Sequence, residues 1–142
     1  MASFSACLPA SPPRPNCLLK PGARACIQSI TIRDDLFERY LRSTDFIQQY
    51  IFPGGQLPSR AALRAEARQA GLEVVNELAF GADYAETLRR WRQRFTAHEA
   101  EVRSLGFDDR SLRTWEFYLA YCEAAFDTGN TDVVQFTLQR RR

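Results

Sequence analysis

Apolar and polar residues alternate along three stretches of the chain, and this alternation predicts three β-strands. They cover residues 24–32, 72–80 and 132–139. The first stretch, RACIQSITI, carries apolar side chains on both faces, which indicates the middle of a covered sheet. One face of this strand would hold Cys26, Gln28, Ile30 and Ile32, and the other Ala25, Ile27, Ser29 and Thr31.

Periodic apolar positions and capping residues predict helices between the strands. Asp34-Asp35 is expected to cap a short helix after the first strand. Residues 46–52 read as a short helical or irregular piece that Pro53-Gly54-Gly55 breaks. Pro58-Ser59 is a start signal for a helix over residues 60–70.

Two longer helices are expected between the second and third strands. The apolar stripe of the first consists of Tyr84, Leu88, Trp91, Phe95 and Val102. The second, about residues 110–127, follows the cap Asp108-Asp109. Phe117 and Tyr121 lie off its main apolar stripe, so this helix is apolar around most of its girth. It should therefore pack between other parts of the protein or line a cavity for something apolar.

Strands separated by helices define an α/β fold. The two long helices bring the chain back as a hairpin, so we expect the last strand to lie antiparallel between the first two. A length of 142 residues suits one domain, and 45% hydrophobic with 25% charged residues indicates a globular chain. The net charge of +2 is too small to indicate a nucleic-acid partner.

The cysteines and the termini limit other classes. Four cysteines without a CxxC pair, and a single histidine, His98, predict no metal site and suit a reducing cytosol. Residues 1–17 read as a disordered, proline- and serine-rich lead-in rather than a signal peptide. The Arg140-Arg141-Arg142 tail is either a solvated terminus or a contact for an anionic surface.

Several motifs resemble one enzyme family. LLKPGARACIQSITI resembles the fifth-strand region of class I S-adenosylmethionine (SAM)-dependent methyltransferases. Downstream, DFIQQYIFPGGQLPS, FGADYAETLRRW, WEFYLAYCEAAF and DVVQFTLQR resemble the C-terminal portion of cyclopropane-fatty-acyl-phospholipid synthases and mycolic acid cyclopropane synthases. The resemblance implies that residues 18–142 form the C-terminal half of a class I, Rossmann-like methyltransferase domain.

The resemblance also implies a reaction, in which a methylene unit passes from SAM to the double bond of an unsaturated phospholipid acyl chain. In the family a bound bicarbonate takes up the proton that the substrate loses as the ring closes. The chain has no GxGxG-like stretch for SAM. A truncated or frameshifted reading frame would lack this motif, and so would one piece of a split protein. The chain is therefore expected to be inactive alone. A separate N-terminal half or a second copy would be its partner, and its location would be cytoplasmic and peripheral to the inner membrane face.

Four residues match positions of the family's base site. Tyr84 falls on a tyrosine that holds the bicarbonate, Gln28 stands where some members have histidine, and Ile30 would offer its backbone amide. Cys122 matches a cysteine regarded as an active-site residue. Read without the family, Tyr84 is a core tyrosine, Gln28 an amide on the sheet, and Cys122 an inert packing thiol. The family's other cysteine and its glutamate have no counterpart in this chain.

The segment YIFPGG matches the mouth of the family's acyl-chain pocket. Tyr50 and Phe52 would form its apolar wall, and Gly54 and Gly55 would let the backbone approach the lipid or the cofactor closely. The alternative is a hydrophobic contact beneath the start of the following helix.

Overall fold

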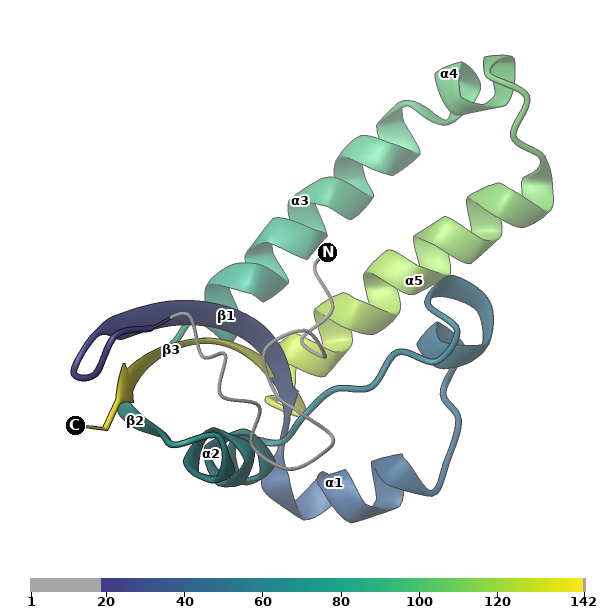
Figure 1. Cartoon of the computed structure of the whole chain (residues 1–142). Helices are drawn as coiled ribbons and strands as arrows, with labels where there is room; N and C mark the ends of the chain where they lie inside the picture. Colours follow the sequence, from purple (N-terminus) through teal and green to yellow (C-terminus); the bar gives the residue numbers. More distant parts are fainter. Residues whose placement is uncertain (1–18, 142) are drawn as a thin grey trace.

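Three strands form one sheet in the computed structural model, which describes residues 19–141. β1 (Arg24–Ile32) and β2 (Leu72–Ala79) flank β3 (Thr131–Arg140), and both run antiparallel to it (Figure 1). The predicted position and direction of the last strand are confirmed. The expected lead-in at residues 1–17 lies outside the described residues, as does Arg142.

The segment between β1 and β2 contains three helical pieces. These are α1 (Asp34–Leu41), the π-helix η2 (Ile47–Ile51) and α2 (Arg60–Gln69). Ser59 caps α2 as predicted, with its hydroxyl accepting the Ala62 N–H at 3.2 Å. The expected capping of α1 by Asp34 is wrong, because the Asp34 carboxylate accepts the backbone N–H of Ala61 in α2 at 3.0 Å.

A helical hairpin extends from the sheet between β2 and β3 (Figure 1). It consists of α3 (Gly81–Ala97), the short α4 (Glu99–Ser104) and α5 (Asp109–Asp127). The single long helix expected as far as Val102 is interrupted at His98, which has φ −109° and ψ 21°. The His98 ring competes for the helix carbonyls, because its Nδ1 lies 2.8 Å from the Arg94 carbonyl oxygen.

Helices cover both faces of the sheet, and each face has its own core. On one face, α2 packs on β2 and β3 through Leu63, Ala67, Leu72, Val134, Phe136 and Leu138. On the other, the hairpin packs against Val133 through Ala85, Leu88, Leu119 and Phe126. The second core lies where the hairpin meets the sheet and brings α3, α5 and β1 together.

The N-terminal half of β1 is more exposed than the sequence predicts. Thr31 and Ile32 are buried, but Cys26 and Gln28 are exposed. The reason is that β1 is an edge strand and the hairpin reaches the sheet only near Ile30 and Val133. Among the described residues, only the bridge between Ile32 and Ser59 pairs with the outer edge of β1.

Candidate functional site

Aromatic side chains join η2 to α5. The ring of Phe46 lies 4.7 Å from that of Phe117 and 6.3 Å from that of Tyr121, measured between centroids. The ring of Tyr50 lies 5.4 Å from that of Phe46, tilted by 38°, and Tyr50 is 57% exposed. The apolar sides of α5 thus contact both α3 and the segment that contains η2. We call Phe46, Tyr50, Phe52, Phe117, Tyr118 and Tyr121 the aromatic junction.

Tyr118 connects the aromatic junction to two predicted site residues. Its ring is 6.3 Å from that of Phe52, and its hydroxyl interacts with the thiol of Cys122 and with Tyr84. Burial, followed by these two neighbours, raises the pKa of Tyr118 to about 12. Tyr84 is half-buried against Phe126, at 5.1 Å between ring centroids. Phe52 is therefore connected to Tyr84 and Cys122 through Tyr118.

The thiol of Cys122 is in its neutral form. Burial is the main reason that its pKa rises to about 11, and a hydrogen bond with Tyr118 lowers the pKa only partly. A thiol acts as a nucleophile or metal ligand through its thiolate, which is scarce at neutral pH with such a pKa. The surroundings of Cys122 suit contact with an apolar group better than covalent chemistry.

Gln28 and Ile30 present polar groups beside this cluster. Ile30 packs on the same core as Tyr84. Ile32 donates its N–H away from β3 to the Pro58 carbonyl at 3.0 Å, and alternation along the strand directs the N–H groups of Gln28 and Ile30 to the same outer edge. The Gln28 amide oxygen accepts a hydrogen bond from Gln135 at 3.1 Å, so its NH₂ group is left to donate.

The two glycines shape the turn after η2. Gly54 has φ +78°, a left-handed conformation that favours glycine. Gly55 donates to the Phe52 carbonyl at 2.9 Å, and an added Cβ would lie 3.1 Å from that oxygen. Gln48 also donates to the Gly55 carbonyl at 3.0 Å. This compact turn holds Phe52 toward α5.

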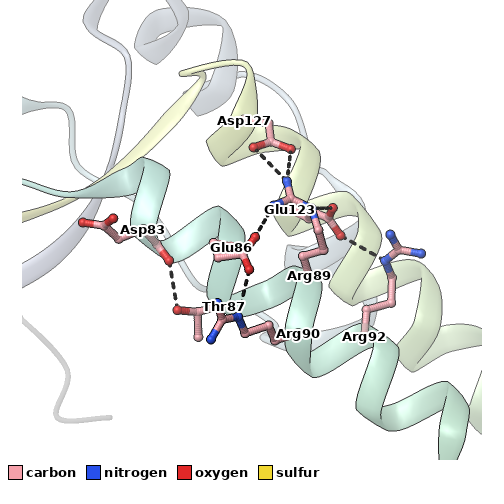
Figure 2. Close-up of polar contacts among 8 residues, drawn as sticks. All are labelled: Asp83, Glu86, Thr87, Arg89, Arg90, Arg92, Glu123 and Asp127. Carbon is pink, nitrogen blue, oxygen red and sulfur yellow. Dashed lines mark hydrogen bonds and ion pairs between the residues drawn. The ribbon is translucent and has the colours of Figure 1, made fainter.

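Charged side chains join the two long helices α3 and α5 (Figure 2). Glu123 is 9% exposed and accepts hydrogen bonds from Arg89 Nε and Arg92 Nε, each at 3.0 Å. Arg89 also bonds Asp127 at 3.0 Å and contacts Glu86. Because Glu123 follows Cys122 directly, the two side chains leave α5 about 100° apart. The ion network therefore fixes the hairpin from one side and leaves the aromatic side open.

The two described hollows lie elsewhere. One, of about 190 Å³, is at the far end of the hairpin beside Phe95 and Leu112. The other, of about 240 Å³, is beside Thr31 and Asp132. Within the aromatic junction, Tyr50, Phe52, Phe117 and Tyr121 are exposed, whereas Phe46 and Tyr118 are partly buried.

SAM does not fit the residues present. β1 is followed by Arg33 and α1, and β2 by Phe80 and α3, so neither strand leads into a glycine-rich loop. Neither of these two strands therefore supplies the cradle of backbone N–H groups that a glycine-rich loop offers to this cofactor. Of the residues expected to hold an anion, Ile30 and Tyr84 pack against the same core, while Gln28 accepts a hydrogen bond from Gln135.

Comparison with known proteins agrees with this fold. The sheet and hairpin resemble mycolic acid cyclopropane synthase CmaA1, solved with SAH and CTAB, with TM-score 0.75 and 28% identity. Cyclopropane synthase MmaA2 from Mycobacterium tuberculosis has the same TM-score at 25% identity. The fold is therefore the C-terminal part of a class I methyltransferase. Residues 14–136 match the family described as mycolic acid cyclopropane synthetase, and the chain belongs to this family.

Curated relatives agree in sequence. Tuberculostearic acid methyltransferase UfaA1 of M. tuberculosis is 43% identical over 124 residues, which is 87% of this chain and 29% of that protein. A probable fatty acid methyltransferase of Pseudomonas putida is 36% identical over 85 residues, 60% of this chain and 21% of that protein. The match to CmaA1 covers 87% of this chain and 46% of that structure. The chain thus spans less than half of each of these relatives.

The sequence left some members of the site unassigned. Phe46 and Tyr118 had only their aromatic character and helical spacing as a signal, and Glu123 none beyond its charge. The structure gives them roles through contacts from distant segments: Phe46 with Phe117, Tyr118 with Phe52, and Glu123 with Arg89.

Proposed function

We propose that this chain is the lipid-binding and base-holding part of a SAM-dependent methyltransferase that modifies the double bond of an unsaturated phospholipid acyl chain. The aromatic junction is the wall for the hydrocarbon tail. Tyr84, Gln28 and Ile30 hold a bicarbonate that accepts the proton lost in the reaction. The chain alone is inactive, because the residues that hold the methyl donor lie outside it.

The observation that carries this proposal is the contact of η2 with α5 through aromatic rings. Tyr50, Phe52 and Phe117 remain 57%, 44% and 51% exposed, although large apolar groups are ordinarily buried. A hydrocarbon tail laid across them would remove that surface from water. Tyr118 then leads from this surface to Tyr84, the residue proposed to hold the base.

The family chemistry demands such a site. A methyl group added to an alkene creates a positive charge on the neighbouring carbon, and water would capture it. Aromatic faces shield this charge and stabilise it by cation–π attraction. The neutral thiol of Cys122 suits a site that holds such a cation, since a thiolate would react with it.

The proposal is tested by transplantation. The matching 124-residue segment of tuberculostearic acid methyltransferase UfaA1 is replaced by the corresponding residues of this chain. With SAM and vesicles of unsaturated phosphatidylglycerol, we expect acyl chains heavier by one CH₂ group in the mass spectrum. The isolated chain should give none, and its conversion of these lipids would contradict its proposed inactivity.

Two variants distinguish base holding from lipid contact. Tyr84→Phe in the chimera keeps the ring and removes the hydroxyl, so we expect lost turnover that added bicarbonate partly restores. Phe117→Ala should weaken lipid affinity and leave the bicarbonate dependence unchanged. An inactive chimera that still folds, judged by its melting curve, would refute the proposal.

Membrane contact is part of the proposal. No helix among residues 19–141 is long and apolar enough to cross a bilayer. We propose peripheral contact with the inner face of the cytoplasmic membrane through the exposed side of the aromatic junction. Cosedimentation with phosphatidylglycerol vesicles should fall for Tyr50→Ser, and an unchanged bound fraction would contradict this docking face.

A second candidate function is that of a non-catalytic subunit which docks on a separate methyltransferase half or on a second copy. The outer edge of β1 favours it, because within residues 19–141 the backbone groups of Gln28 and Ile30 on this edge have no strand partner. Mixing the chain with a SAM-binding half made from UfaA1 should give a complex by size-exclusion chromatography. Replacing Gln28 by Pro should abolish it, and a chain that elutes alone in both mixtures would exclude docking.

A further inference from the structure

α3 begins without a capping side chain of its own. Its N-cap residue is Phe80, which cannot accept a hydrogen bond through its side chain. The first turn of a helix leaves backbone N–H groups that need acceptors. In α3 one acceptor comes from a distant strand, since the Asp132 carboxylate Oδ1 accepts the Gly81 N–H at 2.8 Å.

Asp132 is itself held in place. Its other oxygen, Oδ2, accepts from Arg60 Nη2 at 2.5 Å, and both side chains are about one-third exposed, at 30% and 33%. Arg60 is the first residue of α2. One carboxylate at the start of β3 thus connects the beginnings of α2 and α3, and its negative charge complements the positive end of the α3 dipole.

Gly81 is matched to this carboxylate. A Cβ at position 81 would lie 2.6 Å from Asp132 Oδ1, closer than real contacts allow, and 3.2 Å from its Cγ, which is tight. Gly81 is buried and has no positive φ, so its lack of a side chain serves the close approach of Asp132 rather than an unusual backbone conformation.

Tyr84 lies in the turn that this contact holds. Tyr84 is three residues after Gly81, and its N–H donates to the Phe80 carbonyl at 3.2 Å. We propose that Asp132 and Gly81 are positioning residues for Tyr84: the carboxylate fixes the first turn of α3 against β3 and so sets where the Tyr84 hydroxyl points. The inference rests on the proposed function of Tyr84, but the anchoring itself is measurable without catalysis.

The first test uses this chain alone. Asp132→Ala should speed amide hydrogen exchange at residues 81–84 and shift the ring-proton resonances of Tyr84, which lies 5.1 Å from Phe126. The matched control is Glu77→Ala, which removes another Arg–carboxylate pair, from Arg64 of α2 at 2.6 Å. It should lower stability and leave the Tyr84 resonances unchanged. Equal effects of the two variants on Tyr84 would overturn the proposal.

The second test uses the pair of residues. Gly81→Ala should displace Tyr84 as strongly as Asp132→Ala, and the double variant should add little, because the clashing carboxylate is then gone. Fully additive shifts would show that Gly81 and Asp132 act separately and would overturn the proposal. Asp132→Asn retains an acceptor for the Gly81 N–H and should partly restore the Tyr84 resonances.

The third test uses the UfaA1 chimera. Asp132→Ala should lower kcat by about 10- to 100-fold, the penalty for a misplaced group, with KM for the lipid nearly unchanged. An unchanged kcat despite shifted Tyr84 resonances would overturn the positioning role. A chimera that is inactive even without the substitution contradicts the proposed function instead, while the resonance measurements still decide whether Asp132 anchors the helix.

Discussion

The rings of Phe46 and Phe117 meet edge to face, with centroids 4.7 Å apart and planes at 78°. This geometry places the positive edge of one ring on the negative face of the other. The two residues come from segments that are far apart along the chain, and their contact places η2 against α5.

This contact should stabilise the fold measurably. A double-mutant cycle with Phe46→Ala and Phe117→Ala is expected to give a coupling free energy of about 1 kcal/mol. Urea unfolding of the four proteins measures it. As a control, Trp91→Ala removes a ring with 50% exposure, and its effect should add to that of Phe46→Ala without coupling. A coupling near zero would mean that η2 is held by its backbone alone.

Cys122 and Tyr118 predict a loss of stability at alkaline pH. Their pKa values rise from 9.0 to about 11 and from 10.0 to about 12, mainly by burial. At pH values between the unfolded and folded pKa values, the unfolded chain binds fewer protons than the folded chain. The free energy of unfolding therefore falls as pH rises through this window, and the contribution of the two groups is fully present below about pH 9. Denaturation midpoints measured from about pH 8, below this window, to about pH 11, within it, should fall less steeply for Cys122→Ser than for the parent chain.

Glu123 is expected to be the most sensitive charged residue of the hairpin. Glu123→Gln leaves Arg89 and Arg92 without their shared carboxylate, and we expect roughly 2 kcal/mol lower unfolding free energy. Glu38→Gln is the matched control, because its pair with Arg42 is 75–80% exposed and should contribute less than about 0.5 kcal/mol. Similar losses in urea melts for both variants would show that the network adds nothing beyond a surface ion pair.

Gly54 tests the turn that holds Phe52. Gly54→Ala places a side chain at φ +78° and should cost about 1 kcal/mol of stability. It should also weaken binding of cis-parinaric acid, followed by fluorescence, because Phe52 would move from Tyr118. Gly71→Ala provides the comparison, since Gly71 has φ +74° at the end of α2. That variant should lose similar stability while binding the probe normally.

Local sequence signals were sufficient for most secondary structure. Alternation in β1 and β3 and the caps at Ser59 and Asp108 are properties of neighbouring residues, and the structure confirms them. The break at His98 was missed because neither glycine nor proline marks it. A ring nitrogen bonded to a carbonyl of the preceding turn leaves no signature in hydrophobic periodicity.

Contacts between distant segments were beyond such signals. Asp34 was expected to cap its own helix, yet it caps α2, because folding brings the start of α2 beside the end of β1. The role of Asp132 likewise depends on where Gly81 lies in three dimensions. The family resemblance named Tyr84 as a site residue, whereas only the coordinates reveal what holds its helix in place.

The sheet has two outer edges, and they differ. The register of β2 on β3 shifts between Val74 and Asn76, and Val75 within this bulge is 40% exposed. A bulge interrupts the regular row of hydrogen-bonding groups that an incoming strand would need. Within residues 19–141 the sheet is therefore asymmetric: β1 offers an incoming strand a regular edge from Arg24 to its bridge at Ile32, whereas the bulge interrupts the edge at β2.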